Sequence, residues 1–224
     1  MIDWQPLLLT LELALVTTGI LFLLGVPLAN WLASLKSRWK PLFEALISMP
    51  LVLPPTVVGF YLLLAFSPGS MVGGWLNSTL GLQLAFSFEG LVIASLIYSL
   101  PFMIQPLQSG FSNIHQSLID AAQTMGKNKW EILVNIQLPN MRPAVITAIV
   151  LSFAHTIGEF GVVLMIGGNI PGETKVASIA IYDQVEAMNY SMAHTYSMIL
   201  FVISFAILSI VYTVNRKTAK SIGP

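Results

Sequence analysis

Four ionisable side chains in or near the apolar stretches of this 224-residue chain have the chemistry to support a reaction: His155, Glu159, Asp183 and His194. Imidazoles and carboxylates of this kind bind metal ions or activate water in hydrolases. Their positions do not follow a metal-ligand spacing such as H-E-x-x-H. The chain has no cysteine, which excludes disulfides, thiolate metal sites and cysteine nucleophiles. The sequence therefore predicts no catalytic, metal-binding or cofactor-binding residues and disfavours a hydrolase.

The composition indicates whether this chain is soluble in water or lies in a lipid bilayer. Charged residues make up 9% of the chain and apolar residues 55%, and the mean hydropathy is +0.79. An ordinary globular chain has about 25% charged residues, so this one cannot cover a soluble surface without very large apolar patches. Ten Lys and Arg balance ten Asp and Glu, which leaves no basic face for nucleic acid. The composition predicts an integral membrane protein that binds no nucleic acid.

Five apolar stretches are long enough to cross a hydrocarbon core of about 30 Å, which takes about 20 helical residues. They are Leu7–Leu35, Leu42–Phe66, Leu91–Leu107, Ala144–Ile166 and Tyr196–Val214. The second contains Pro50, Pro54 and Pro55, which should kink or break it. A sixth crossing or a half-span has room in residues 67–90 or 174–193. We predict an all-α membrane domain over residues 1–224 with five to six transmembrane helices.

The first stretch is interpreted as a retained span. No positive charge precedes it, and it is far longer than the apolar region of a signal peptide, which has about 7–15 residues.

The basic residues predict the orientation. Nine of the ten follow the first, third and fifth stretches: Lys36, Arg38, Lys40, Lys127, Lys129, Arg142, Arg216, Lys217 and Lys220. With five crossings these three segments share one side, which the positive-inside rule assigns to the cytoplasm. The N-terminus would then be outside and the C-terminus in the cytoplasm.

Residues 108–142 form the longest segment on the positive side. Asn113 is a candidate helix cap, and Leu118, Ile119, Ala122 and Met125 recur at helical spacing. Gly126 suits the position that ends such a helix. Asn128, with Glu131 three residues later, predicts a capping box and a second helix. That helix should end near Leu138, because Pro139 disfavours helical geometry in the residue before it.

This helix–Gly–helix element with an apolar side has two interpretations. It can be an amphipathic connector that rests on lipid headgroups. Alternatively, it can be a docking element for a soluble partner, since Ala121 and Ala122 permit close approach of another backbone. The pattern alone leaves both open.

The same segment resembles the EAA loop of the membrane subunits of ABC importers. Asp120-Ala121-Ala122, Gly126 and Ile136-Gln137-Leu138-Pro139 match the signature E-A-A-x3-G-x9-I-x-L-P, with Asp120 in place of Glu. In that family the loop docks on the ATP-hydrolysing subunit and transmits its movement to the pore. The resemblance assigns this coupling role to seven residues: Asp120, Ala121, Ala122, Gly126, Ile136, Leu138 and Pro139.

The resemblance also implies the fold and the partners. It implies a type I importer-like permease that forms a homodimer in the cytoplasmic (inner) membrane of a bacterium or archaeon. Two ATP-binding subunits and an extracytoplasmic binding protein would complete the assembly. The chain has no G-x-x-x-x-G-K-[ST] phosphate-binding loop. It is therefore expected to be no enzyme and to bind no cofactor itself, with ATP and Mg used by the partner.

Further segments resemble the molybdate branch of this family. They are Leu51–Gly59, Gly158-Glu159-Phe160-Gly161 and Gly168–Thr174, and they imply import of molybdate by a molybdate-loaded binding protein. Sulfate permeases are close relatives, and tungstate matches molybdate in charge and size, so both stay as alternatives. An ion-coupled secondary transporter is the remaining rival, because such carriers also use broken helices. We find no internal repeat of the kind that usually marks one.

Candidate pathway or gating residues come from the polar interruptions of these spans. The predicted spans contain no Lys or Arg, so an oxyanion would pass by means of water, hydroxyl groups and backbone N–H groups. Gly167–Thr174 interrupts an apolar region, either as part of the pathway or as an external packing segment. His155 and Glu159, four apart, are predicted on one helix face, with Glu159 hydrogen-bonded to His155 or a neighbouring helix. The candidates are Thr56, His155, Glu159, Asn169 and Thr174.

Overall fold

The computed structural model describes residues 2–221, and every regular element in that range is a helix. In chain order the elements are α1 (Gln5–Ser34), α2 (Lys40–Val52), α3 (Pro55–Phe66), α4 (Met71–Leu80), α5 (Phe88–Ser112), α6 (Gln116–Thr124), α7 (Lys129–Ile132), the π-helical turn η1 (Leu133–Gln137), α8 (Leu138–Asn140), α9 (Arg142–Ile157), α10 (Gly161–Gly167), α11 (Ala177–Glu186) and α12 (Tyr190–Ser221). The predicted all-α class is confirmed.

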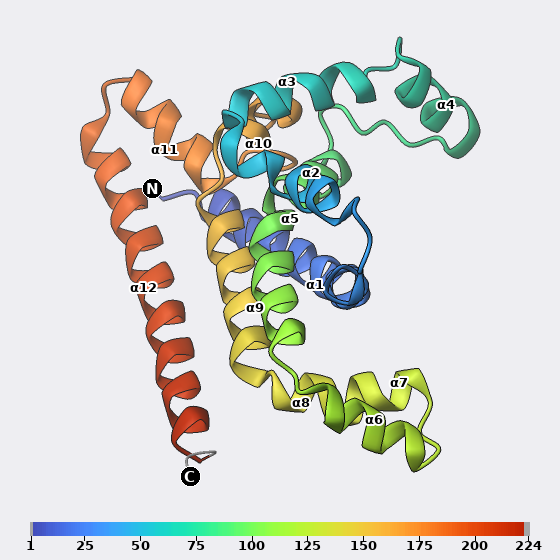
Figure 1. Ribbon diagram of the computed structural model, residues 1–224. Helices are drawn as coiled ribbons and strands as arrows, with labels where there is room; N and C mark the ends of the chain where they lie inside the picture. The colour runs from blue at the N-terminus through green and yellow to red at the C-terminus, as the bar shows by residue number, and fades with distance from the viewer. Residues whose placement is uncertain (1, 222–224) are drawn as a thin grey trace.

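Three single helices are long and apolar enough to cross a membrane: α1, α5 and the Tyr190–Thr213 part of α12. They coincide with the first, third and fifth predicted spans. α1, α5 and α9 pack against one another at the centre of the molecule, and α12 stands at its edge against α9 and α11 (Figure 1). The central core contains Leu21, Met103 and Ile104, each at most 2% exposed.

The second predicted span is broken, as its prolines indicate. α2 and α3 meet at an angle of 107°. Leu53 and Pro54 have extended ψ angles of 137° at the break, and Pro55 begins α3. Proline has no N–H to donate and favours extended geometry in the residue before it, so Pro54 and Pro55 together stop α2. Pro50, by contrast, lies inside α2.

The fourth predicted span, Ala144–Ile166, is wrong as a continuous helix. α9 ends at Ile157, and α10 begins at Gly161. Gly158 is the C-cap of α9, and the backbone carbonyl of Glu159 accepts a hydrogen bond from the Ser178 hydroxyl at 2.6 Å. A backbone group released from the helix thus finds a side-chain partner on α11, which makes a break tolerable inside a membrane domain.

The two regions with room for a further crossing contain half-length helices. α4 and α11 have ten residues each, which at 1.5 Å per residue is about 15 Å. That is half of a hydrocarbon core. Within residues 2–221, length and composition alone give up to five candidate spans when each of two bent pairs, α2 with α3 and α7–α8 with α9, is counted as one. In the second pair, only α9 coincides with a predicted span.

The predicted cytoplasmic elements lie together at one end of the molecule. The last described turns of α12 point toward the end that carries α6, α7 and α8, and α10 and α11 lie at the opposite end (Figure 1). Lys36 lines a cavity together with Gln116 of α6 and Gln137 of η1. The basic segment after α1 therefore lies beside the segment that carries Lys127, Lys129 and Arg142, as the orientation prediction requires.

Candidate functional site

The cytoplasmic segment folds as a hairpin of α6 against α7, η1 and α8, which we call the coupling hairpin (116–140). Gly126 has a left-handed φ of 76°, which glycine adopts without steric cost. Its N–H donates to the Gln123 carbonyl at 2.9 Å, and the Lys127 N–H donates to the Ala122 carbonyl at 3.1 Å. These two bonds form a Schellman motif, so the predicted role of Gly126 in ending the helix is confirmed.

The predicted capping box at the start of α7 is also confirmed. The Asn128 side chain accepts from the Glu131 N–H, and the Glu131 carboxylate accepts from the Asn128 N–H, both at 2.9 Å. Lys127 donates to the same carboxylate at 3.1 Å. The Asn128 N–H and then Lys127 hold the pKa of Glu131 below its ordinary value. The carboxylate therefore stays charged, and the turn between the two helices is fixed locally.

Two details of the predicted hairpin are wrong. Asn113 is the C-cap of α5 and does not start α6, whose N-cap is His115. The second helix does not stop near Leu138 but continues through Pro139 to Asn140. It continues because η1 widens the turn: the Leu138 N–H bonds to the Leu133 carbonyl, five residues back. A π-helical turn of this kind takes in a proline that an α-helix would exclude.

The coupling hairpin exposes apolar side chains together with the residues of its motif. Asp120 and Ala121 are exposed, whereas Ala122 is 4% exposed and faces into the hairpin. Ile136 and Leu138 are half-buried, and Pro139 is exposed. Four large apolar side chains are exposed on the same hairpin: Leu118, Met125, Trp130 and Val134. An apolar surface of this kind, outside the predicted spans, suits a docking site for another protein.

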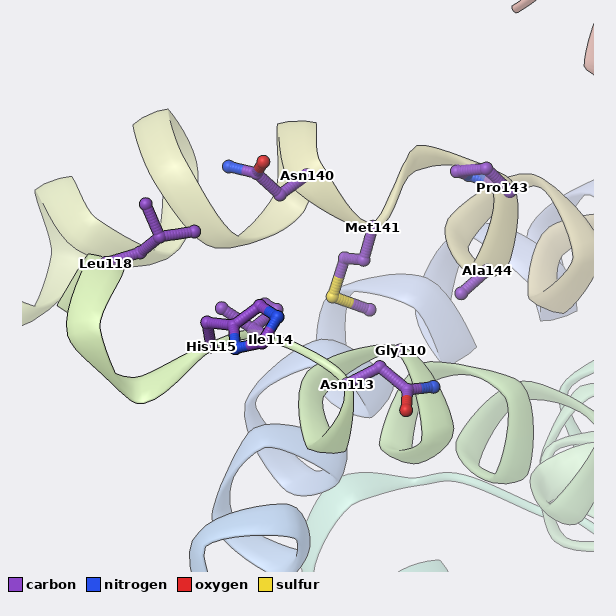
Figure 2. Close-up of a pocket in the computed structure, with 9 residues that line it drawn as sticks. All are labelled: Gly110, Asn113, Ile114, His115, Leu118, Asn140, Met141, Pro143 and Ala144. Atoms are coloured by element: carbon purple, nitrogen blue, oxygen red, sulfur yellow. The ribbon is translucent and has the colours of Figure 1, made fainter. Parts of the chain in front are cut away.

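The hairpin joins the spans at an elbow where α8 meets α9, with an angle of 84° between α7–α8 and α9. A cavity of about 290 Å³ lies beside this elbow, and Figure 2 shows the Met141 side chain extending into it toward Gly110 and Asn113 of the α5 end. Leu118 and Asn140 line its far side. Met141 is 4% exposed and belongs to the central core, so the elbow is packed on the spans.

Gly110 allows α5 to approach this elbow closely. A Cβ atom at this position would lie 2.7 Å from the Ala144 Cβ atom and 2.7 Å from the Met141 Cε atom. We expect Gly110→Val to lower the free energy of unfolding by about 1–3 kcal/mol, because overpacked side chains force the helices apart. Thermal unfolding of the detergent-solubilised protein measures this change. Gly19→Val is the matched control, since nothing lies within 4 Å of a Cβ atom there. Equal melting temperatures for the two variants would contradict the expectation.

A second cavity lies where the two helix breaks meet. It has a volume of about 460 Å³ and is lined by Pro55, Thr56, Tyr98, Ala154, His155, Gly158, Glu159, Phe160 and Gly161. The start of α3 and the start of α10 approach closely there, because a Cβ atom on Gly161 would lie 2.8 Å from the Pro55 Cβ atom. Among the residues that the structure describes, neither Lys nor Arg lines this break cavity.

Polar side chains of α5 hold the break cavity together. The Ser95 hydroxyl donates to Glu159 Oε2 at 2.6 Å, and the Ser99 hydroxyl lies 2.9 Å from His155 Nδ1. His155 also stacks on Phe102, with 4.0 Å between ring centroids. The predicted hydrogen bond from Glu159 to a neighbouring helix is confirmed. The placement of His155 and Glu159 on one helix is wrong, because α9 ends between them.

Asn169 and Thr174 do not line the break cavity. The Thr174 hydroxyl donates to the Gly167 carbonyl at 2.6 Å and accepts from the Ile170 N–H at 2.9 Å. The Asn169 amide donates to both oxygens of Asp183, which also forms an ion pair with Lys175. These contacts fold the 167–175 loop onto α11, so the structure brings Thr56, His155 and Glu159 together and places Asn169 and Thr174 apart.

Sequence reasoning missed several residues of both sites. Ser95 and Ser99, one helical turn apart, form a polar stripe on α5, and this spacing was an available signal for a polar partner. The phenol ring of Tyr98 lines the same cavity. On the coupling hairpin, Trp130 is 69% exposed, and its position directly after the capping box was an available signal.

Comparisons with known proteins place the chain in a family. Residues 22–220 match the family described as the binding-protein-dependent transport system inner membrane component. The chain is 47% identical over 215 residues to a molybdenum transport system permease protein of Azotobacter vinelandii, covering 96% of this chain and 95% of that one. It is 34% identical over 186 residues to the one of Escherichia coli K12, covering 82% and 80%. A sulfate transport system permease protein of Escherichia coli K12 is 27% identical, with coverage of 88% and 71%.

Solved structures share the fold. A chain of the MetNI methionine ABC transporter in an inward-facing conformation superposes with a TM-score of 0.72 at 14% identity, covering 95% of this chain and 94% of that one. A chain of a bacterial ABC transporter that imports alginate gives a TM-score of 0.74 at 17% identity, with coverage of 96% and 80%. The chain therefore belongs to the family of binding-protein-dependent transport system inner membrane components, the membrane permease subunits of ABC importers.

Proposed function

We propose that this chain forms the membrane pathway of an ATP-driven molybdate importer, as a homodimer in the cytoplasmic membrane. Two ATPase subunits would bind the coupling hairpins, and an extracytoplasmic molybdate-binding protein would deliver the ion. We choose molybdate as the cargo because the chain is 47% identical to a molybdenum transport system permease protein over nearly the whole of both chains. ATP and Mg would be used by the ATPase subunits.

The structure suggests how movement reaches the pathway. The hairpin is connected to α5 through residues 113–115 and to α9 through the elbow at Met141. α5 carries Ser95 and Ser99, while α9 and the break after it carry His155 and Glu159. A displacement of the hairpin by the ATPase would therefore move both α5 and α9. Each of these hydrogen bonds has one partner on α5 and the other on α9 or the break after it. Because α3 packs on α10 at the break cavity, this shift would open or close the space beside Thr56.

The break cavity suits a conduit for a tetrahedral dianion. An Arg or Lys facing it would bind the ion tightly and slow its release. The polar residues that line the cavity are instead Thr56, Tyr98, His155 and Glu159, and the Glu159 carboxyl group is hydrogen-bonded to Ser95. Selectivity would then come from the binding protein outside the membrane. Transient hydrogen bonds from water and hydroxyl groups would be enough for passage.

Reconstitution tests the proposal. Proteoliposomes that contain this chain, its ATPase partner and the loaded binding protein should accumulate molybdate only when ATP is present. Unlabelled tungstate should compete at a concentration similar to molybdate, and sulfate only at a much higher one. Preferential uptake of sulfate would show that the cargo is sulfate, the ion named for the more distant sulfate transport system permease protein. Uptake driven by an ion gradient without ATP would overturn the ABC mechanism itself.

A further inference from the structure

A third cavity, of about 240 Å³, lies between the predicted cytoplasmic ends of the spans and the coupling hairpin. Four segments contribute polar side chains to its wall. They are the end of α1 and the residues after it with Asn30, Ser34 and Lys36, the end of α5 with Ser112, α6 with Gln116, and η1 with Gln137. We call it the hairpin cavity. It is separate from the break cavity, with which it shares no lining residue.

The hairpin cavity is lined by polar side chains and one positive charge, and the Ser34 hydroxyl and the Gln116 amide already donate to Trp31 and Asp120. It contains the Lys36 ammonium, three side-chain amides and two hydroxyl groups, and no Asp or Glu among the described residues that line it. Within residues 2–221, Lys36 forms no ion pair, and the side chains of Asn30 and Gln137 form no hydrogen bond to the protein. Gln137 is only 8% exposed and lines the cavity, so its side-chain amide is accessible from there.

Exposed tryptophans near Lys36 are of the kind found at the depth of lipid headgroups. Trp31 and Trp39 flank Lys36 in sequence and are 44% and 54% exposed, as expected for interfacial tryptophans. The Arg38 guanidinium lies 5.5 Å from the centre of the Trp39 ring. On the cytoplasmic side of a membrane, pockets with basic residues between helix ends attract anionic headgroups.

We propose that the hairpin cavity binds a tetrahedral oxyanion, the phosphate of an anionic phospholipid, with Lys36 as the charged contact and Asn30 and Gln137 as amide donors. A phosphate group has only acceptor oxygens at its surface, and Lys36, Asn30 and Gln137 can each donate a hydrogen bond to them. Its binding connects the end of α1 to η1 and α6. The headgroup therefore holds the coupling hairpin in place against the spans.

Hydrogen exchange in nanodiscs tests this proposal on the purified transporter with its ATPase partner. Wild-type protein in phosphatidylcholine with added phosphatidylglycerol should show slower exchange in residues 116–140 than in phosphatidylcholine alone. Lys36→Gln should weaken the response to phosphatidylglycerol about fivefold, the effect of one cation near an anionic surface. Lys36→Arg should restore it. Lys40→Gln is the matched control, since Lys40 is four residues away, does not line the cavity and lies 4.0 Å from Glu44.

A second arm separates the lipid from a soluble ion. Inorganic phosphate is titrated against the same protein in phosphatidylcholine alone. Protection by phosphate without any response to phosphatidylglycerol would overturn the lipid as the source of the oxyanion. A response that is equal in the wild type and in Lys36→Gln, or no response in either arm, would overturn the site. Hydrogen exchange is measured without any transport, so its result tests the lipid site independently of the proposed molybdate import.

Discussion

Ala121→Trp is expected to reduce ATP-driven uptake by about 30-fold or more while the chain remains folded and inserted. Ala121 is exposed on α6 beside Asp120, on the hairpin that also presents Met125 and Trp130. If this surface lies in a groove of the ATPase, an indole at position 121 holds the two proteins apart. The loss of one central contact at a protein interface costs about 2 kcal/mol or more, which corresponds to the expected factor.

The measurement combines co-purification of the ATPase with uptake in proteoliposomes. Ser78→Trp adds the same side chain at an exposed position on α4, which lies at the end of the molecule opposite to the hairpin, and should leave the amount of bound ATPase unchanged. Ala122→Trp is a second comparison, because Ala122 is 4% exposed inside the hairpin and its replacement should unfold the hairpin itself. Normal uptake and a normal amount of bound ATPase in Ala121→Trp would show that the ATPase docks elsewhere.

Local signals made the coupling hairpin predictable. The capping box of Asn128 and Glu131 lies within four residues, and the Schellman turn at Gly126 within six. Each is determined by hydrogen bonds between neighbouring residues, which the sequence alone specifies. The break between α2 and α3 was predictable for the same reason, because Pro54 and Pro55 restrict the backbone and remove an N–H donor at their own positions.

Long-range contacts explain what the sequence could not predict. The helix after Ala144 keeps an apolar pattern up to Ile166, and it is broken because Glu159 meets Ser95 on α5 and Ser178 on α11, 64 and 19 residues away in sequence. The continuation of the hairpin through Pro139 depends on a widened turn rather than on propensity. Similarly, Thr56 and His155 share a cavity only because two broken helices meet there.

The contact between Ser95 and Glu159 gives the second large expected effect. Glu159 is 4% exposed, its Oε2 atom accepts the Ser95 hydroxyl, and its Oε1 atom has no partner within the described chain. We expect Glu159→Ala to lower the free energy of unfolding by about 1–3 kcal/mol, because it leaves the buried Ser95 hydroxyl without its hydrogen-bond partner. Uptake should fall about tenfold or more, because the broken segment between α9 and α10 loses its attachment to α5. Glu159→Gln preserves size and an acceptor oxygen, so it should lose less stability and impair transport mainly through assembly or gating.

A double-mutant cycle tests the pairing of Ser95 with Glu159, and the ratio of ATP hydrolysed to ion transported distinguishes a positioning role from contact with the cargo. Ser95→Ala and Glu159→Ala should show a coupling energy of about 0.5–3 kcal/mol in thermal unfolding, as residues in one hydrogen-bonded pair do. A purely structural contact would change stability alone, whereas a contact that positions the gate also changes the ratio of ATP hydrolysed to ion transported. We therefore expect Glu159→Gln to alter that ratio. Glu159→Gln protein with normal complex yield, normal ATPase coupling and no molybdate entry would show instead that the carboxyl group meets the ion directly.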